Sequence, residues 1–273
     1  MQNSYEAKDV KILEGLDAVR LRPGMYIGTT GLKGLHHILW ELVDNAIDEV
    51  SNGFGNKITV TLHSNGSASV EDDGRGIPVD VHPQLGVSGV EVVFTQLHAG
   101  GKFDTHNYSF SGGLHGVGAS VTNALSEWLK VYVYKDGWEY RMEFASYEDE
   151  DGKIKSGVSQ GDLLKIAPTT KSGTLISFYP DKRIFDSITF NNEAIIKRLK
   201  ELAFLNKGIT IVFQDLRDES NLIKKEYFYE GGLCYFVRYV NEAKNPLHEP
   251  IYFENTKDDI NLCMAMQYND SYT

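Results

Sequence analysis

The stretch His36-His37-Ile38-Leu39-Trp40-Glu41-Leu42-Val43-Asp44-Asn45-Ala46-Ile47-Asp48-Glu49-Val50 guides the interpretation of the whole chain. Apolar residues recur in it at steps of three and four, which places them on one side of an α-helix, toward a core. They are Leu39, Val43, Ala46, Ile47 and Val50. A second row at the same steps carries a base, an amide and two carboxylates: His37, Asn45, Glu41 and Asp48. The stretch therefore predicts a core helix whose other face forms a site.

A solvated helix face is the alternative interpretation of this polar row. Such a face usually pairs acids with bases four residues away, yet no Lys or Arg occurs between Lys33 and Lys57. Asn45 is also a poor helix former in a mid-helix position. Carboxylates about 6 Å apart repel each other, so a cation or a buried water network would complement them. The stretch alone does not decide between the two complements.

The composition bounds the class of protein. The chain has 273 residues, 41% of them hydrophobic, which is enough for one core and a second, smaller unit. The net charge of −11 argues against nucleic-acid binding by this piece alone. Two isolated cysteines, Cys234 and Cys263, predict no disulfide framework or zinc site. With no apolar signal region and no membrane-length apolar run, we expect a soluble cytoplasmic protein without membrane contact.

A carboxylate pair follows a predicted hairpin. Lys57 to His63 alternates as a strand, Asn65-Gly66 is typical of a hairpin turn, and Ser67 to Glu71 is the return strand. The return strand runs into Asp72 to Pro78, with the sequence Asp-Asp-Gly-Arg-Gly-Ile-Pro. This arrangement places an acid beside backbone that a ligand can approach closely. A plain Asx-Gly turn is the competing interpretation.

A glycine-rich segment, Ser111 to Gly118, leads into a predicted helix from Ala119 to Leu125. Free N–H groups and the dipole at a helix N-terminus attract anions. The segment has neither the Gly-Lys-Ser/Thr of a Walker loop nor the preceding strand of a Rossmann fingerprint. An anion site and a flexible glycine loop are both compatible with it.

Several later segments alternate as strands of one sheet. They are Trp128 to Tyr134, Trp138 to Ala145, Asp162 to Ala167 and Gly173 to Tyr179. We expect the acidic stretch Glu148 to Gln160 to be a solvated connection. At Glu230-Gly231-Gly232 the pattern resets with an amphipathic helix. We therefore expect one domain over residues 1–230 and the truncated beginning of a second over 231–273.

Four features stand in order along the chain: Glu41 with Asn45 on a helix, Asp72 to Gly76 after a hairpin, Lys102 before a polar segment, and Gly113 to Gly118 at a helix start. The ordered set resembles the ATP-binding module of the GHKL superfamily, which is shared by type II topoisomerases, MutL-type repair proteins, heat-shock chaperones and histidine kinases.

More narrowly, Arg22 to Gly28, His98 to Phe103 and Ser111 to Gly118 resemble the bacterial type IIA topoisomerase family, its gyrase branch more closely than topoisomerase IV. The likeness runs essentially end to end. It implies an α+β fold, a two-layer sandwich of helices on a mixed β-sheet of the Bergerat type, followed by the start of an α/β transducer domain. It also implies ATP binding and hydrolysis that couple dimerisation to DNA strand passage and negative supercoiling.

The resemblance implies roles for particular residues. Glu41 would polarise the attacking water, His37 would orient Glu41, and Asn45 would bind the Mg²⁺ that bridges the phosphates. Asp72 would accept the amino group of adenine, which discriminates this base from one carrying a carbonyl. The other implied nucleotide contacts are Gly76, Ile77, Val93 and Thr174 at the adenine, Lys102, Tyr108, Leu114, His115, Gly116, Val117 and Gly118 at the phosphates, and Tyr5 and Tyr26.

Partners also follow from the resemblance. It implies self-dimerisation on ATP binding, with Tyr5 crossing to the other protomer, and an A2B2 heterotetramer with a DNA-cleaving gyrase A protein. Aminocoumarin-type inhibitors would bind near Asp72, Arg75 and Lys135, with Glu49 pairing with Arg75. The family commonly has an arginine in place of Lys135, and a lysine lacks its planar fork. We expect the family's phosphate-contacting lysine of the second domain to lie beyond this piece, which would leave its hydrolysis weak.

Three rival functions predict different properties. The topoisomerase IV ATPase differs mainly through the protein with which it assembles. A histidine-kinase-type phosphotransferase would need a dimerising helix pair upstream of His36 and His37, and we expect too few residues there. A module that only senses nucleotide would not need Glu41 and Asn45.

Overall fold

The computed structural model describes residues 15–97, 116–258 and 260–271. Its helices are α1 (Leu16–Leu21), α2 (Gly24–Ile27), α3 (Leu32–Ser51), α4 (Gly89–Thr95), α5 (Gly118–Ala124), α6 (Asn192–Leu205) and α7 (Gly232–Val240). Its strands are β1 (Lys57–Leu62), β2 (Ala68–Asp72), β3 (Ser126–Lys135), β4 (Trp138–Glu148), β5 (Ile154–Ser159), β6 (Leu164–Pro168), β7 (Gly173–Pro180), β8 (Thr210–Asp215), β9 (Ile223–Tyr227), β10 (Ile251–Lys257) and β11 (Ile260–Met266).

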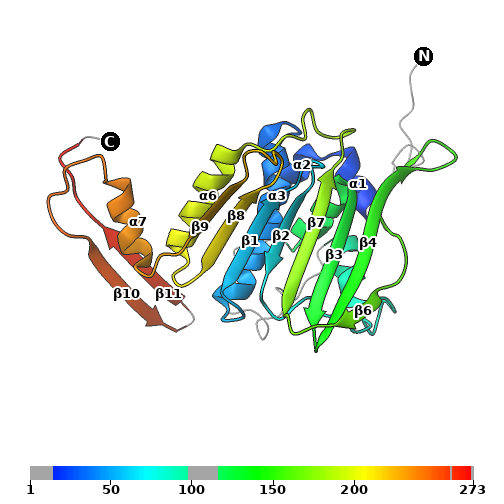
Figure 1. Ribbon diagram of the computed structural model, residues 1–273, viewed down its shortest axis with the longest axis horizontal. Helices are drawn as coiled ribbons and strands as arrows, with labels where there is room; N and C mark the ends of the chain where they lie inside the picture. Colours follow the sequence, from blue (N-terminus) through cyan, green and yellow to red (C-terminus); the bar gives the residue numbers. More distant parts are fainter. Residues whose placement is uncertain (1–14, 98–115, 259, 272–273) are drawn as a thin grey trace, which may run out of the picture.

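The main layer of the described fold is a nine-stranded sheet. Its strand order is β5-β4-β3-β7-β2-β1-β8-β9, with β6 paired to β4. β1 and β8 run parallel. β1 and β2 pair antiparallel, and so does each pair of neighbours in the series β2, β7, β3, β4 and β5. Helices α1, α2 and α3 lie on one face of the sheet (Figure 1). The expected α+β class, with helices layered on a mixed sheet, is confirmed.

The long helix α3 packs against β1 and β2. Its predicted apolar stripe is buried, with Leu39 and Val43 fully inaccessible to solvent. Leu35, Ile38 and Leu42 widen this stripe. Each fully buried aliphatic side chain contributes about 1.5–3 kcal/mol through its removal from water. The helix is longer than the sequence indicated, because it begins at Leu32 and ends at Ser51.

The predicted hairpin of β1 and β2 is also confirmed. Val60 of β1 faces Val70 of β2 in the antiparallel ladder. β2 pairs on its other side with β7, and this register places Asp72 beside Thr174. Because hydrogen-bonded neighbours fix β2 on both sides, the position of Asp72 at its end is well defined.

Helix α5 is fastened to several elements through its C-terminal turn. The Thr122 hydroxyl donates to the carbonyl of Ile38 in α3 at 3.0 Å. The buried Asn123 amide donates to the carbonyls of Phe94 in α4 at 3.0 Å and Gly157 in β5 at 2.9 Å. These bonds satisfy buried polar groups, and they leave α5 little freedom to slide.

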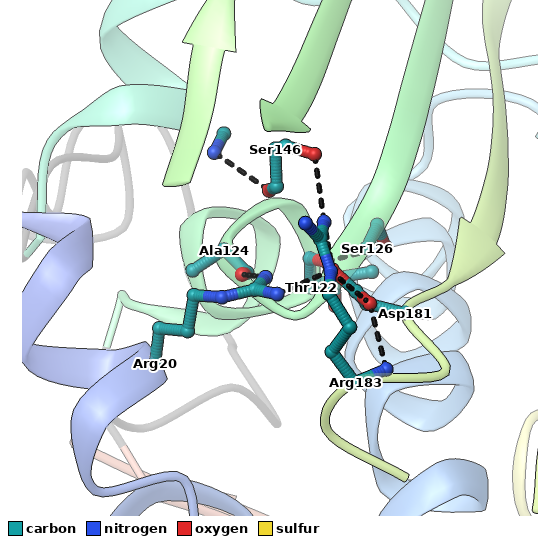
Figure 2. Close-up of polar contacts among 8 residues, drawn as sticks. Arg20, Thr122, Ala124, Ser126, Ser146, Asp181 and Arg183 are labelled. Atoms are coloured by element: carbon teal, nitrogen blue, oxygen red, sulfur yellow. Dashed lines mark hydrogen bonds and ion pairs between the residues drawn. The ribbon is translucent and has the colours of Figure 1, made fainter. Parts of the chain in front are cut away.

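A buried ion cluster completes this attachment (Figure 2). Arg20 of α1 donates to the carbonyl of Ala124 and to the carboxylate of Asp181. Arg183 donates to the same carboxylate at 2.7 Å and to the carbonyl of Ser146 in β4 at 2.8 Å. Burial raises the pKa of Asp181, but the hydrogen bonds from Arg183 and Arg20 outweigh it, so the net pKa is lowered. The cluster ties α1, α5 and β4 to the end of β7.

The expectation for Glu148 to Gln160 was wrong in its second half. Residues 154–159 form β5, which pairs with β4. Ser156 and Gly157 are buried there. Asn123 lies so close that a Cβ at Gly157 would be 2.5 Å from its amide nitrogen. A Gly- and Ser-containing stretch carries no local signal for this contact with α5.

The last described residues form a smaller unit beside β9 (Figure 1). β10 and β11 make a separate two-stranded sheet. α7 packs toward α6, where the Phe204 ring lies 5.6 Å from Phe236 and 5.3 Å from Tyr239, centroid to centroid. The boundary at residue 231 stays a prediction. Among the described helices, none has the length and apolar character to cross a membrane.

We predict that Asp181→Asn lowers the free energy of unfolding by about 3–5 kcal/mol at pH 7. The reason is that the Arg20 side chain, only 8% exposed, would keep its charge without a counterion. Because the pKa of Asp181 is lowered in the folded chain, its contribution is present above the pKa of an unfolded aspartate, about 3.9, and is lost as the pH falls.

Urea unfolding at pH 7 and near pH 3 would test this. The exposed Asp186 is the matched control, and Asp186→Asn should change stability by less than about 0.5 kcal/mol. Equal stability of Asp181→Asn and the unmodified chain at pH 7 would refute the role of the cluster.

Candidate functional site

The site begins with an ion pair on α3. His37 Nε2 lies 3.1 Å from Glu41 Oε1, one helical turn away. The side chains are 42% and 29% exposed, so both are half-buried. The hydrogen bond to Glu41 raises the pKa of His37 above its ordinary value, which favours the imidazolium beside the carboxylate. His37 therefore fixes one oxygen of Glu41.

The other oxygen of Glu41 faces the first residue of α5. A Cβ at Gly118 would lie only 1.9 Å from Glu41 Oε2. Any larger residue would displace the carboxylate or separate α3 from α5. Gly116, two residues earlier, has φ of +60°, a conformation that glycine adopts at low cost. The glycines before α5 thus allow backbone to meet a carboxylate directly.

Asp72 forms the second end of the site. Its carboxylate accepts from the backbone N–H of Gly74 at 2.9 Å. Burial raises the pKa of Asp72 to about 7, and the charges of Glu49 and Asp73 add to the shift. A carboxyl group whose pKa is strongly shifted by desolvation is a candidate functional residue.

The neighbouring acid has a different task. Asp73 accepts from the backbone N–H groups of Asn56 and Lys57, both at 2.8 Å, and so holds the start of β1. The bond from Gly74 to Asp72 is the local Asx turn that the sequence offered as an alternative. The turn and the placed acid are therefore both present.

The segment after Asp72 lies against β7. The N–H of Ile77 donates to the Thr174 hydroxyl at 3.3 Å, and Thr174 is only 4% exposed. Gly76 has φ of +75° and packs tightly, since a Cβ there would lie 3.0 Å from Val133. The structure thus brings Asp72, Gly76, Ile77 and Thr174 together, and their contacts with adenine stay predictions.

The expected pair of Arg75 and Glu49 is present. Arg75 Nε lies 2.8 Å from Glu49 Oε1, and Arg75 Nη2 lies 3.0 Å from Oε2, a bidentate geometry. The guanidinium also lies 3.5 Å from the centre of the Phe54 ring. Lys135 contacts the same segment through main-chain carbonyls. Sequence reasoning missed both Phe54 and this contact, because neither has a local pattern.

For several predicted site residues the structure gives a position and does not test a contact with nucleotide. Asn45 is half-buried on α3, Val93 is half-buried on α4, Tyr26 lies on α2, and Val117 is the N-cap of α5. Their nucleotide roles stay predictions. Five predicted contacts lie outside the described residues: Tyr5, Lys102, Tyr108, Leu114 and His115. Within the described residues, no group of three His, Cys, Asp or Glu side chains could hold a metal ion.

The site combines a carboxylate on one helix, a second helix that begins with glycine, and a desolvated aspartate at the end of a strand. This combination is typical of one class of nucleotide-binding protein. Residues 31–183 match the family of histidine kinase-, DNA gyrase B- and HSP90-like ATPases. The chain belongs to this family.

Within this family, the chain is similar to DNA gyrase B proteins. The chain is 49% identical over 272 residues to the DNA gyrase B protein of Staphylococcus aureus strain Mu50 and, again at 49%, to that of Staphylococcus epidermidis. These alignments cover 99% of this chain and 41% of each relative. The chain is also similar to a crystal structure of the 43K ATPase domain of Thermus thermophilus gyrase B in complex with an aminocoumarin. The TM-score is 0.79 and the identity 34%, covering 94% of this chain and 63% of that one.

We predict that Asp72→Asn stabilises the nucleotide-free chain at pH 8. A folded pKa of about 7 against an unfolded pKa of about 3.9 means that the ionised carboxylate costs stability above pH 7, by at most about 4 kcal/mol. This cost shrinks as the pH falls from 7 toward 4, where the folded carboxyl group is neutral. The gain from Asp72→Asn should shrink with it.

Thermal unfolding between pH 5 and 8 measures this difference. Asp73→Asn is the matched control, and it should destabilise by about 1 kcal/mol because two backbone donors lose a charged acceptor. A gain from Asp72→Asn that does not depend on pH would contradict the assignment.

Proposed function

We propose that this chain is the ATP-binding and ATP-hydrolysing module of a DNA gyrase B protein. The observation that carries the proposal is the position of Glu41, with one oxygen 3.1 Å from His37 and the other against Gly118. A carboxylate held in this way, at the start of a helix that attracts phosphate, is suited to polarise a water molecule.

Asp72 supplies base recognition in this proposal. Its carboxyl group accepts the exocyclic amino group of adenine, and its partner strand β7 presents Thr174 beside it. A buried carboxylate would lose its bonding partner with a base that offers a carbonyl in place of the amino group. Gly76 and Ile77 form the wall next to this contact.

The cofactors are ATP and Mg²⁺. Asn45 lies one turn after Glu41 and offers an amide oxygen, a hard donor that suits Mg²⁺. Mg²⁺ in nucleotide sites is usually held by one or two protein ligands together with phosphate oxygens and water. When bound, the ion neutralises phosphate charge. Tyr26, Val93 and the amides from Gly116 to Gly118 are proposed to complete the contacts, with Tyr5, Lys102, Tyr108, Leu114 and His115.

The proposed hydrolysis assigns separate tasks to two side chains. Glu41 orients the attacking water and takes its proton, while His37 keeps the carboxylate turned toward that water. The hydrogen bond between them raises the pKa of His37, which favours the charged form of the imidazole beside the carboxylate. His37 is thus a positioning residue in this scheme.

The whole protein's activity extends the proposal. The chain spans 41% of the length of the relatives named above. By their likeness, the whole protein would dimerise on ATP binding, join gyrase A in an A2B2 heterotetramer, pass DNA and introduce negative supercoils in the cytoplasm. The Thermus thermophilus structure contains an aminocoumarin, and we propose that Asp72 and Arg75 would meet such an inhibitor here.

We predict that Glu41→Ala leaves the affinity for a non-hydrolysable ATP analogue within about twofold and lowers turnover at least about 100-fold. The reason is that the water loses its base while the adenine contacts remain. Binding is measured by calorimetry on this chain, and turnover by phosphate release from the full-length protein.

The exposed Glu193, in the first turn of α6, provides the matched control. Glu193→Ala should leave both quantities unchanged. If Glu41→Ala turned over ATP at the rate of the unmodified protein, Glu41 would not be the base.

A further inference from the structure

The wall segment, residues 74–77, is the part of the proposed adenine pocket without regular secondary structure. It follows β2 and must hold its shape without a ladder of its own. Three contacts already described fasten it: Gly74 to Asp72, Arg75 to Glu49, and Ile77 to Thr174. In the first and last of these contacts the donor is a backbone N–H. In the second, the backbone N–H of Arg75 also donates to Glu49, at 2.9 Å. The carbonyl oxygens of this segment therefore need other partners.

Lys135 supplies a partner to two of these oxygens. Its ammonium donates to the carbonyl of Arg75 at 3.0 Å and to that of Gly76 at 3.4 Å. Lys135 is the last residue of β3, where it pairs with Trp138 of β4. Its strand position is therefore fixed by the sheet, and its flexible stem spans from the sheet to the wall.

The acceptors of the half-buried Lys135 ammonium are carbonyl oxygens of the main chain. Among the residues that the structure describes, no carboxylate lies within ion-pair distance of the Lys135 ammonium. Lys130, on the same strand, lies instead 3.7 Å from Glu143. A charged donor on neutral carbonyls forms a charge-assisted bond that also orients the peptide planes. The contact thus acts on backbone position, where a side-chain ion pair would not.

The wall segment has little room to move. Around Gly76, a Cβ would approach Val133 at 3.0 Å, the carbonyl of Gly173 at 3.1 Å and that of Tyr134 at 3.2 Å. The backbone of the wall therefore lies directly on β3 and β7, and any displacement must carry it away from these strands. The bond from Lys135 opposes this movement.

We propose that Lys135 is a positioning residue for the adenine pocket, because its ammonium holds the carbonyls of Arg75 and Gly76 and so keeps the wall segment seated on the sheet. This inference rests on the proposed function for its consequence in nucleotide binding. The ligand concerned is an adenine nucleotide, and the reacting phosphates are untouched by the contact. Loss of the ammonium should therefore weaken binding without altering the chemistry at Glu41.

Lys135→Met tests this, because methionine keeps an unbranched apolar stem and removes the donor. The affinity for the ATP analogue should fall about tenfold, the equivalent of one charge-assisted hydrogen bond. Lys135→Arg retains donors for both carbonyls and should stay within about threefold of the unmodified chain. In the full-length protein, Lys135→Met should raise KM and leave kcat unchanged. The matched control Lys130→Met, on the same strand, should change none of these quantities.

A second measurement, of amide resonances by NMR, reports on the wall segment itself. In the nucleotide-free chain, the amide resonances of Gly76 and Ile77 should shift in Lys135→Met, and should not shift in Lys130→Met. Unchanged amide resonances, or unchanged affinity, would overturn the inference. A lowered kcat with unchanged KM would overturn it too, because the contact would then act on the chemistry. Absence of analogue binding by the unmodified chain would instead overturn the proposed function, and the amide shifts would still report whether Lys135 holds the wall.

Discussion

The contact between Glu41 and Gly118 is the constraint on which the arrangement of the site depends. It requires α3 and α5 to meet with no side chain between them, since a Cβ would lie 1.9 Å from the carboxylate oxygen. Helix α5 is short, and its C-terminal turn fixes it by bonds to α1, α3, α4 and β5. The buried cluster around Asp181 adds the end of β7 to this set (Figure 2). Attachment at one end of a rigid helix thereby positions the glycine at its other end.

Two acids of helix α3 each have a basic partner. His37 pairs with Glu41, and Arg75 pairs with Glu49. Asp72 has a different environment, because burial dominates over its hydrogen bonds and raises its pKa to about 7. Carboxylates in one small region thus have different surroundings, two of them paired with a base and one buried. The buried setting of Asp72 suits the hydrogen bond to adenine that we propose for it.

Identical residue types acquire different tasks through their positions along a strand. Asp72 and Asp73 are adjacent, yet Asp73 holds the backbone at the start of β1 while Asp72 sits between β1 and β7. Lys130 and Lys135 share β3, yet one meets a carboxylate and the other meets carbonyls. In each pair, the alternation and end of a strand determine which partner the side chain reaches.

The sequence by itself determined the local elements and the order of the motifs. The 3.6-residue period of α3, the Asn65-Gly66 turn and the strand alternation depend on neighbours a few residues apart, so they could be predicted. The resemblance also indicated the pair of Arg75 and Glu49 before any geometry was known. Only the tertiary structure decided that residues 154–159 form a strand, that Phe54 lies beside Arg75, and that Lys135 bonds to the wall. These contacts join residues far apart in the chain, and their energy comes from burial and hydrogen bonding that exist only once the layers have packed.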